Sequence, residues 1–204
     1  MTTFTRNQRS LLAIYYLSSP SERHDGMTWY DRAQDFCRNT GLELGVPYDV
    51  VAAVVAVLSP RQSWVDNKNY AHGIIEWFQS GLDTPNTEDF PVFKVNVDKA
   101  WGILTANQNN ETFTQFVRGP KVTAFYHNLL GHNAYLTIDT HALNAWCGGV
   151  REFHKYTKKE RTQCDADYRV VAEHLGLAPS ALQAIIWVTW RGMVFSQERL
   201  ATLG

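Results

Sequence analysis

Cysteine, net charge and long apolar runs are all scarce in this chain of 204 residues. The three cysteines, Cys37, Cys147 and Cys164, form no Cys-x-x-Cys pair, so the sequence predicts neither a disulfide framework nor a cysteine-ligated zinc or iron–sulfur site. A formal net charge of −1 supplies no overall attraction to polyanions. Any contact with nucleic acid must therefore come from a local basic surface.

Targeting and membrane-spanning patterns are also missing. The polar residues 1–9 lead into a short apolar stretch that has neither a signal-peptide cleavage pattern nor a membrane-spanning length. We therefore expect a cytoplasmic protein without a membrane partner. With 45% hydrophobic residues, the chain can bury a sizeable core as one domain or as two small lobes.

Strand signals are absent as well, since the chain has no Asn-Gly hairpin and no series of alternating segments. Apolar residues recur at helical spacing, which predicts an all-α fold. Pro20 is expected to stop the first helix, Thr28 to cap the second and Gly41 to end it. The segment from Pro47 to Pro60 is rich in valine, but its length and interspersed alanines favour a buried helix over a strand. The other expected helices are 5–18, 28–40, 63–79, 93–106, 119–130, 139–148, 157–175 and 179–200, with a connector at 82–92 and a loop at 107–110.

The most informative pair of residues is Lys121 and Asp139, which are eighteen positions apart. Lys121 follows Gly119-Pro120 at the expected start of one helix, and Asp139 is placed to cap the next. If both converge on one cleft, the carboxylate can stabilise a cationic sugar carbon while the amine captures that carbon as an imine. Taken singly, each is also an ordinary residue: a solvated Lys early in a helix and a structural N-cap.

The segments around this pair resemble the helix-hairpin-helix DNA glycosylase superfamily, in particular its endonuclease III-like branch. Residues 116–124 and 136–143 are similar to the segments that hold the family's Schiff-base Lys and its catalytic Asp, at the same spacing. Upstream, residues 56–62 and the following Asn67-Lys68 are similar to the family's Leu-Ser-Ala-Gln segment and its Asn-Lys. The resemblance covers residues 50–150, approximately.

The resemblance implies a single helical domain over residues 1–204, with two lobes and a cleft between them. It implies a DNA glycosylase, with or without an AP-lyase activity, that acts on a base or modified base in DNA without a cofactor. Lys121 would be the nucleophile and Asp139 its electrostatic partner. The corner formed by Arg61, Gln62 and Trp64 would fill the gap left by a flipped base, although an ordinary interhelical turn explains the same pattern.

Two departures from the family pattern concern how the substrate is held. The family's hairpin reads Leu-Pro-Gly-Val-Gly before the Lys, whereas this chain has Phe116 at the Pro position, Val117 at the first Gly position and only Gly119 retained. We expect Arg118 and Gly119 to contact DNA, with a changed backbone approach to phosphate because one tight position lacks glycine. The four-Cys iron–sulfur motif of many relatives is absent, and no metal is predicted.

A basic segment downstream is a second candidate DNA contact. Positive side chains concentrate between Arg151 and Arg161, and Lys155 and Lys158 are the expected phosphate contacts. A solvated helix start explains the same charges. The last helix is apolar around Trp187, which is expected to pack in the core, although a ring there could also line a base pocket.

Two other functions fit the sequence. Some phage proteins that resemble the same fold add amino acids or polyamines to activated thymine derivatives in hypermodified DNA, and such a protein would work in the host cytoplasm. The altered hairpin is compatible with this transferase activity. A non-catalytic DNA-binding module is the other alternative, and it would tolerate the loss of Lys121 or Asp139. DNA is the only partner predicted, without a protein partner.

Overall fold

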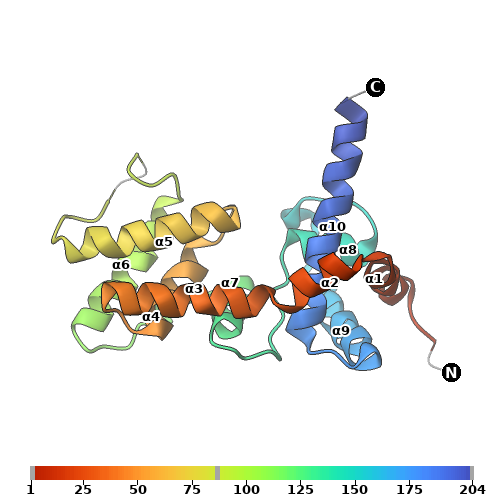
Figure 1. The fold of residues 1–204 in the computed structure, drawn as a ribbon, viewed down its shortest axis with the longest axis horizontal. Coiled ribbons are helices and arrows are strands. Elements are labelled where there is room, and N and C mark those ends of the chain that lie inside the picture. The colour runs from red at the N-terminus through yellow and green to blue at the C-terminus, as the bar shows by residue number, and fades with distance from the viewer. Residues whose placement is uncertain (1–2, 86–87, 203–204) are drawn as a thin grey trace. The chain divides into compact units, whose positions relative to one another are not determined.

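The computed structural model describes residues 3–85 and 88–202, and this part of the chain is helical (Figure 1). Within these ranges no strand occurs, so the all-α prediction is confirmed. The elements are α1 (Arg6–Leu17), α2 (Pro20–Met27), α3 (Trp29–Leu44), α4 (Tyr48–Leu58), α5 (Trp64–Gln79), α6 (Lys94–Gln108), the 3-10 helix η1 (Thr114–Phe116), α7 (Pro120–Leu129), α8 (Thr140–Cys147), the 3-10 helix η2 (Phe153–Lys155), α9 (Lys158–Leu175) and α10 (Pro179–Thr202).

The chain divides into two compact units. The first, which we call the terminal unit, combines Met1–Asp31 with His132–Gly204, and the second, the central unit, consists of Arg32–Gly131. Helix α3 begins in the terminal unit and continues in the central unit, and the chain leaves the central unit after Gly131. The central unit is therefore an insertion in the sequence of the terminal unit.

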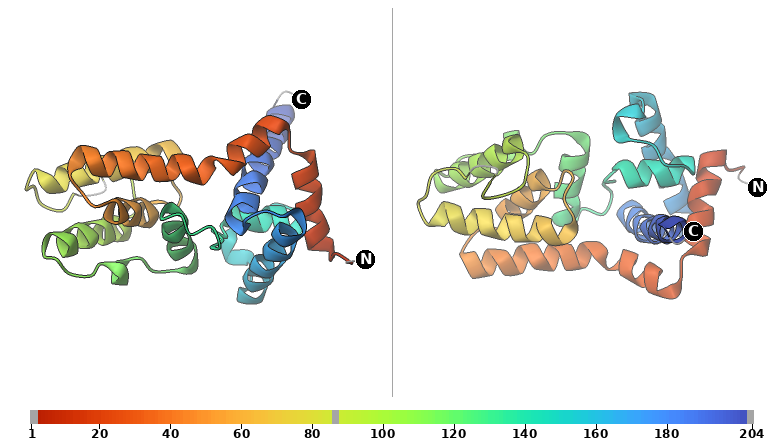
Figure 2. Two further views of the ribbon diagram at one scale, coloured as in Figure 1. Left: turned by 60° about the horizontal axis from the view of Figure 1, so that its bottom comes forward. Right: turned by 90° about the horizontal axis from the view of Figure 1, so that it is seen from above.

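The core of the terminal unit is built from α1, α8, α9 and α10, which are grouped with α2 in Figure 2. Leu11, Leu143, Tyr168 and Ile186 come from four different helices, and each is fully buried. Burial of one such side chain contributes about 1.5–3 kcal/mol, so contacts between these helices are the main source of stability for this unit.

A buried carboxylate also joins three of these helices. Asp167 of α9 is 2% exposed. Its Oδ1 accepts hydrogen bonds from Gln8 Nε2 at 2.7 Å and Gln163 Nε2 at 3.1 Å, and its Oδ2 accepts one from Trp146 Nε1 at 2.8 Å. Because these donors satisfy the carboxylate, it can remain in the core and hold α1 and α8 against α9.

Helices α2 and α10 cross very closely at Gly26. A Cβ atom built on Gly26 would lie 2.4 Å from Cα and 2.6 Å from the backbone nitrogen of Ile185. Both atoms belong to the backbone of α10, so no rotamer change could relieve such a contact. The absence of a side chain at position 26 is what permits the crossing.

The central unit is organised around α4, in which every residue from Val50 to Leu58 is buried. A helix that is apolar on all sides is stable only when other elements surround it. Helices α5, α6 and α7 all pack against α4 and supply buried side chains that include Ile74, Ile103 and Leu129. The predicted buried helix between Pro47 and Pro60 is confirmed, with Pro47 as its N-cap residue.

The prediction of a helix that follows Thr28 is confirmed, since α3 begins at Trp29, but its predicted end at about Thr40 was wrong. Thr28 is also the C-cap residue of α2, and its hydroxyl donates to the His24 carbonyl at 2.8 Å. Gly41 lies within α3, where a Cβ would come within 2.7 Å of the Val46 carbonyl oxygen. The residue with the left-handed conformation that ends the helix is Gly45, with φ of 65°.

Helix α2 itself was not predicted. Pro20 was expected to be only a stop signal, but it is the first residue of α2. Ser19 and Glu22 form a capping box in which each side chain accepts a hydrogen bond from the other residue's backbone N–H. The predicted loop at 107–110 also begins too early, because α6 continues through Gln108.

In the described ranges, no single helix is long and apolar enough to cross a membrane, whereas two bent pairs of consecutive helices, α3 with α4 and α9 with α10, meet that length and composition together.

Candidate functional site

Lys121 occupies the first turn of α7, as predicted. Pro120 is the first helical residue, and the turn before it is fixed by a hydrogen bond of 3.2 Å from the Thr123 hydroxyl to the Val117 carbonyl. The Lys121 side chain is half-buried and has no hydrogen-bond or ion-pair partner in the described part of the chain. Its amine is therefore not committed to a structural contact and remains available for chemistry.

The segment before α7 combines a required glycine with an ordinary valine. Gly119 has φ of 101°, which only glycine adopts readily, whereas Val117 has φ of −84° and needs no glycine. No side chain caps α7, so its first N–H groups can receive an anion. The exposed guanidinium of Arg118 has no partner among the described residues.

Phe116 holds the segment before α7 in place by packing against α6. A Cβ built on Gly102 of α6 would lie 2.6 Å from the Phe116 ring, so the ring covers the bare backbone of that helix. The hydrophobic contact with α6 anchors η1 and the turn that follows it. Phe116 is thus a packing residue.

Asp139 is the N-cap residue of α8, which confirms the capping prediction. Its Oδ1 accepts a hydrogen bond of 2.8 Å from the Ala142 N–H, while Oδ2 has no partner among the described residues. Tyr168 supports the same turn, because its hydroxyl donates to the Ala142 carbonyl at 3.3 Å. Burial, assisted by the charges of Cys164 and Asp139, raises the pKa of Tyr168 well above its ordinary value, so this hydroxyl stays a neutral donor.

Lys121 belongs to the central unit and Asp139 to the terminal unit. The Lys121 amine and the Asp139 Oδ2 both lack a partner among the described residues, and each residue lies at the start of a helix within its own unit. The expectation that both groups reach one substrate remains a prediction.

The turn between α4 and α5 carries the predicted Arg61–Trp64 corner. Arg61 is exposed and has φ of 65°, a left-handed conformation that is uncommon for a residue with a side chain. Its guanidinium lies 5.4 Å from the centre of the Phe93 ring, and Gln62 Nε2 donates to the Pro91 carbonyl at 3.2 Å. Both side chains therefore hold this turn against residues 91–93. Arg61 is exposed, whereas Gln62 is half-buried.

Trp64 is half-buried and lies in an aromatic cluster that the sequence analysis missed. Its ring centre is 5.9 Å from that of Phe36 and 6.5 Å from that of Phe125, with steep angles of 77° and 75° between the ring planes. The Lys68 amine lies 5.7 Å from the ring centres of both Trp64 and Phe36. Only the spacing of Trp64 and Lys68 by four positions could have indicated this cluster from the sequence, because Phe36 and Phe125 come from other helices.

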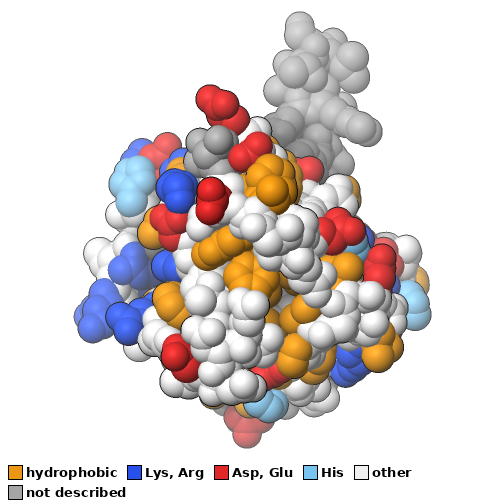
Figure 3. All heavy atoms as spheres, turned by 90° about the vertical axis from the view of Figure 1, so that its left-hand side faces the viewer, with side chains coloured by type: hydrophobic (Ala, Val, Ile, Leu, Met, Phe, Trp, Pro, Cys, Tyr) orange, Lys and Arg blue, Asp and Glu red, His pale blue; other side chains and the backbone are white. Residues whose placement is uncertain are grey.

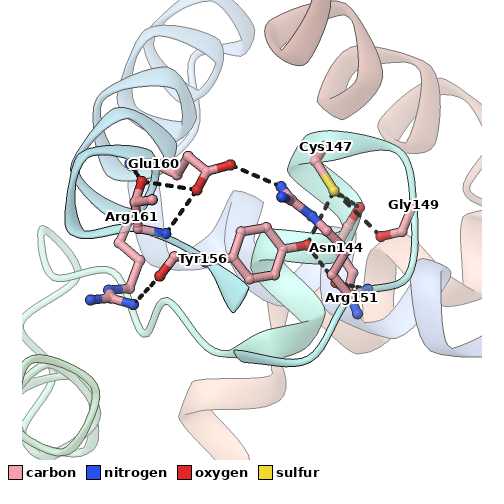
Figure 4. Close-up of polar contacts among 8 residues, drawn as sticks. Asn144, Cys147, Gly149, Arg151, Tyr156, Glu160 and Arg161 are labelled. Carbon is pink, nitrogen blue, oxygen red and sulfur yellow. Dashed lines mark hydrogen bonds and ion pairs between the residues drawn. The ribbon is translucent and has the colours of Figure 1, made fainter. Parts of the chain in front are cut away.

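The basic segment is largely paired within itself, as Figure 4 shows for two of its members. Arg151 bonds Glu160 at 3.0 Å and covers the Tyr156 ring at 4.0 Å from its centre. Arg161 donates to the Tyr156 carbonyl at 2.5 Å. These two arginines thus hold the chain between α8 and α9 and are not free for phosphate.

The Tyr156 hydroxyl completes this network at the end of α8 (Figure 4). It donates to Asn144 Oδ1 at 2.6 Å and lies 3.1 Å from Cys147 Sγ. Asn144 Oδ1 also accepts from the Arg151 N–H at 2.9 Å. Burial is the largest of several causes that raise the pKa of Tyr156, so its hydroxyl remains protonated and keeps these contacts.

The lysines of the segment differ in availability. Lys155 is 3.7 Å from Glu152, which also contacts His154 at 3.3 Å. Lys158 and Lys159 are exposed in the first turn of α9 and have no ion-pair partner in the described ranges. Of the two predicted phosphate contacts, Lys158 is therefore the one without a competing carboxylate. On the face shown in Figure 3, Lys and Arg side chains are most frequent towards the left-hand edge, with a few on the right.

Among the described residues there is neither a cluster of metal ligands nor a disulfide. No group of three or more His, Cys, Asp or Glu residues is arranged to hold a metal ion in the part of the chain that the structure describes. The three cysteines are free thiols. Burial raises the pKa of Cys37 to about 12, so this thiol is unreactive in the folded chain.

The described residues thus define an all-α protein with two compact units and unpaired functional groups at two helix starts. The chain belongs to the family described as "Family of unknown function (DUF7178)", which matches residues 1–194. No curated protein and no solved structure matches the chain.

Proposed function

We propose that the protein is a DNA glycosylase of helix-hairpin-helix type, with a two-lobed fold, that acts on a base or modified base. Lys121 attacks C1′ of the sugar as the N-glycosidic bond breaks and the base leaves with its electron pair, and Asp139 stabilises the positive charge that develops on the sugar. Opening of the sugar ring, with loss of a proton from the amine, then gives an imine between Lys121 and C1′. If the imine formed by Lys121 persists, it acidifies the neighbouring proton and permits elimination of the 3′ phosphate, which is AP-lyase chemistry. The proposal requires both groups to reach the same sugar.

The observation that carries this proposal is the state of Lys121. Its amine is half-buried and has no carboxylate partner among the described residues. It lies in the first turn of α7, where no side chain caps the N–H groups, so a phosphate of the substrate could bind beside it. An amine that is not held by a structural contact is available to act as a nucleophile.

Phosphate contacts are proposed for Arg118, Gly119 and Lys158. Arg118 is exposed beside the uncapped N–H groups of α7, and Lys158 is exposed without an ion pair. Each Lys or Arg that neutralises a phosphate should change the slope of log K against log salt by about one. Lys155 should contribute less, because Glu152 competes for its charge.

Borohydride trapping on a duplex with one abasic site tests the chemistry. Wild-type protein should form a covalent adduct, and Lys121→Ala should abolish it. Lys99→Ala is the matched control, since Lys99 is also a half-buried lysine of the central unit without an ion pair. Asp139→Asn should lower the rate of adduct formation while the fold survives, because Asn caps a helix as well as Asp. An undiminished adduct in Lys121→Ala would remove Lys121 from its role.

A transferase acting on hypermodified DNA is the second candidate, and Val117, at the position of the first glycine in the hairpin that the segment resembles, is compatible with it. Nucleoside analysis by mass after incubation with DNA discriminates between the two. A glycosylase releases free base, whereas a transferase leaves a heavier nucleoside. A protein that binds DNA with either residue replaced and yields neither product would be a binding module.

A further inference from the structure

The central unit contains a half-buried cluster of aromatic rings around an unpaired ammonium group. Phe36 of α3 and Trp64 of α5 meet edge to face, with ring centres 5.9 Å apart, and Lys68 lies one helical turn after Trp64. Two rings at a steep angle form a corner, and a planar molecule can lie flat on one wall with its edge against the other.

Lys68 is the first sign that this corner receives a ligand. The side chain is half-buried, and no carboxylate pairs with it in the described ranges. Its amine is stabilised only by the two ring faces, each 5.7 Å away at the centre. An anionic group that arrives beside the rings would give this ammonium the partner that the chain does not supply.

Asn67 is the second sign, and it is independent of the first. It is 2% exposed, and its Oδ1 is a buried oxygen for which the described residues provide no hydrogen-bond donor. Native interiors satisfy nearly all such atoms, so an exception requires an explanation. Asn67 follows Trp64 by three positions and therefore lies on the same side of α5, where an N–H group of a ligand could satisfy it.

We propose that Phe36, Trp64 and Lys68 form a binding site for one nucleotide of a DNA strand. The base stacks in the corner of the two rings, and its phosphate pairs with the Lys68 ammonium. Naming DNA as the source rests on the proposed function, because a free nucleotide has the same chemistry. Phe125 links this binding site to Lys121. Its ring centre is 6.5 Å from that of Trp64, and it follows Lys121 by four positions on α7.

Fluorescence anisotropy with a labelled single-stranded oligonucleotide tests the proposal, and the experiment is carried out in the Lys121→Ala background. Binding is then measured without chemistry, so failure of the glycosylase assay does not affect the result. Trp64→Leu should weaken binding by about 5- to 150-fold, the range for loss of one base stack. Trp64→Phe should restore most of the affinity because it keeps an aromatic face.

The charge is tested separately. Lys68→Met keeps the alkyl stem, and it should weaken binding and lower the salt slope by about 0.7, the contribution of one phosphate on a single strand. Lys99→Met removes the same charge from another half-buried lysine, and its salt slope should equal that of the parent protein. Melting curves verify that each variant is folded.

Asn67→Leu separates a ligand contact from an internal one. Leucine has nearly the same shape, so the variant should melt higher than the parent if Oδ1 is unsatisfied, and it should bind the oligonucleotide less well. A lower melting temperature would mean that the fold itself satisfies Asn67.

Three results would overturn the proposal. The first is that folded Trp64→Leu binds the oligonucleotide as tightly as the parent. The second is that Lys68→Met and Lys99→Met give the same slope of log K against log salt. The third is that Asn67→Leu has a lower melting temperature than the parent. Thymidine monophosphate that competes as well as the oligonucleotide would overturn the assignment to a DNA strand.

Discussion

The contact between α2 and α10 makes the effect of one methyl group at position 26 calculable. In Gly26→Ala the new Cβ would lie 2.4 Å from Cα of Ile185, where about 3.4 Å is an ordinary contact, so the two helices must separate by about 1 Å. Overpacking of this kind costs about 1–3 kcal/mol, and a clash with backbone belongs near the upper end. The better helix propensity of alanine returns about 1 kcal/mol. The net destabilisation is therefore about 2 kcal/mol.

Thermal unfolding followed by circular dichroism measures this change. For a chain of this length, about 2 kcal/mol corresponds to a melting temperature lower by about 4–8 °C. Gly192→Ala in α10 is the matched control, since its Cβ would come no closer than 3.3 Å to a described atom, and that atom is the flexible carboxylate end of Glu22. This control should be neutral or more stable by up to about 1 kcal/mol. Equal stability of Gly26→Ala and wild type would refute the close crossing.

Three further predictions concern the terminal unit and the thiols. Asp167→Ala leaves the buried donors Gln8 Nε2 and Trp146 Nε1 without an acceptor and should destabilise the fold by about 3 kcal/mol or more in urea unfolding, whereas Asp165→Ala, at a half-buried position of the same helix, should change it by less than about 1 kcal/mol. Hydrogen bonds lower the pKa of Glu160 below its ordinary 4.5, so its carboxylate contributes its full stabilisation above that pH. The destabilisation caused by Glu160→Gln should therefore shrink as the pH falls below 4.5. A difference in stability that does not change with pH would contradict this. A thiol reagent should label Cys147 in the folded protein but modify the buried Cys37 only after denaturation, which mass spectrometry resolves by peptide.

The sequence predicted most helices because their signals are local. Apolar spacing and capping residues identified α4, α5 and α7 to within a residue or two of their ends. The errors near the N-terminus have one physical cause, which is that proline and glycine have two uses. Pro20 both prevents one helix from continuing and starts the next, and Gly41 serves a close backbone contact inside α3 while Gly45 provides the turn.

The candidate site was predictable only where it depends on neighbours in sequence. The N-cap role of Asp139 and the glycine requirement at Gly119 follow from adjacent residues, and the structure has both. Which charges stay unpaired depends on distant contacts. Arg151 is taken by Glu160, nine positions away, and Phe36 meets Trp64 across two helices. A spacing of nine positions is no regular helical contact, and Phe36 and Trp64 are far apart in sequence, so spacing alone could not distinguish the unpaired Lys158 from its paired neighbours.

Because the terminal unit is formed by two separate segments of the chain, the two units can complete their folding at different times during synthesis. Every helix partner that the central unit needs has been translated once residue 131 is complete, so this unit can fold while the ribosome is still working. Helices α1 and α2 are translated before the central unit, yet their partners α8, α9 and α10 are translated after it. The apolar face that includes Leu11 therefore stays without its native partners during the synthesis of more than a hundred residues. The terminal unit can complete its core only after the whole central unit has been translated.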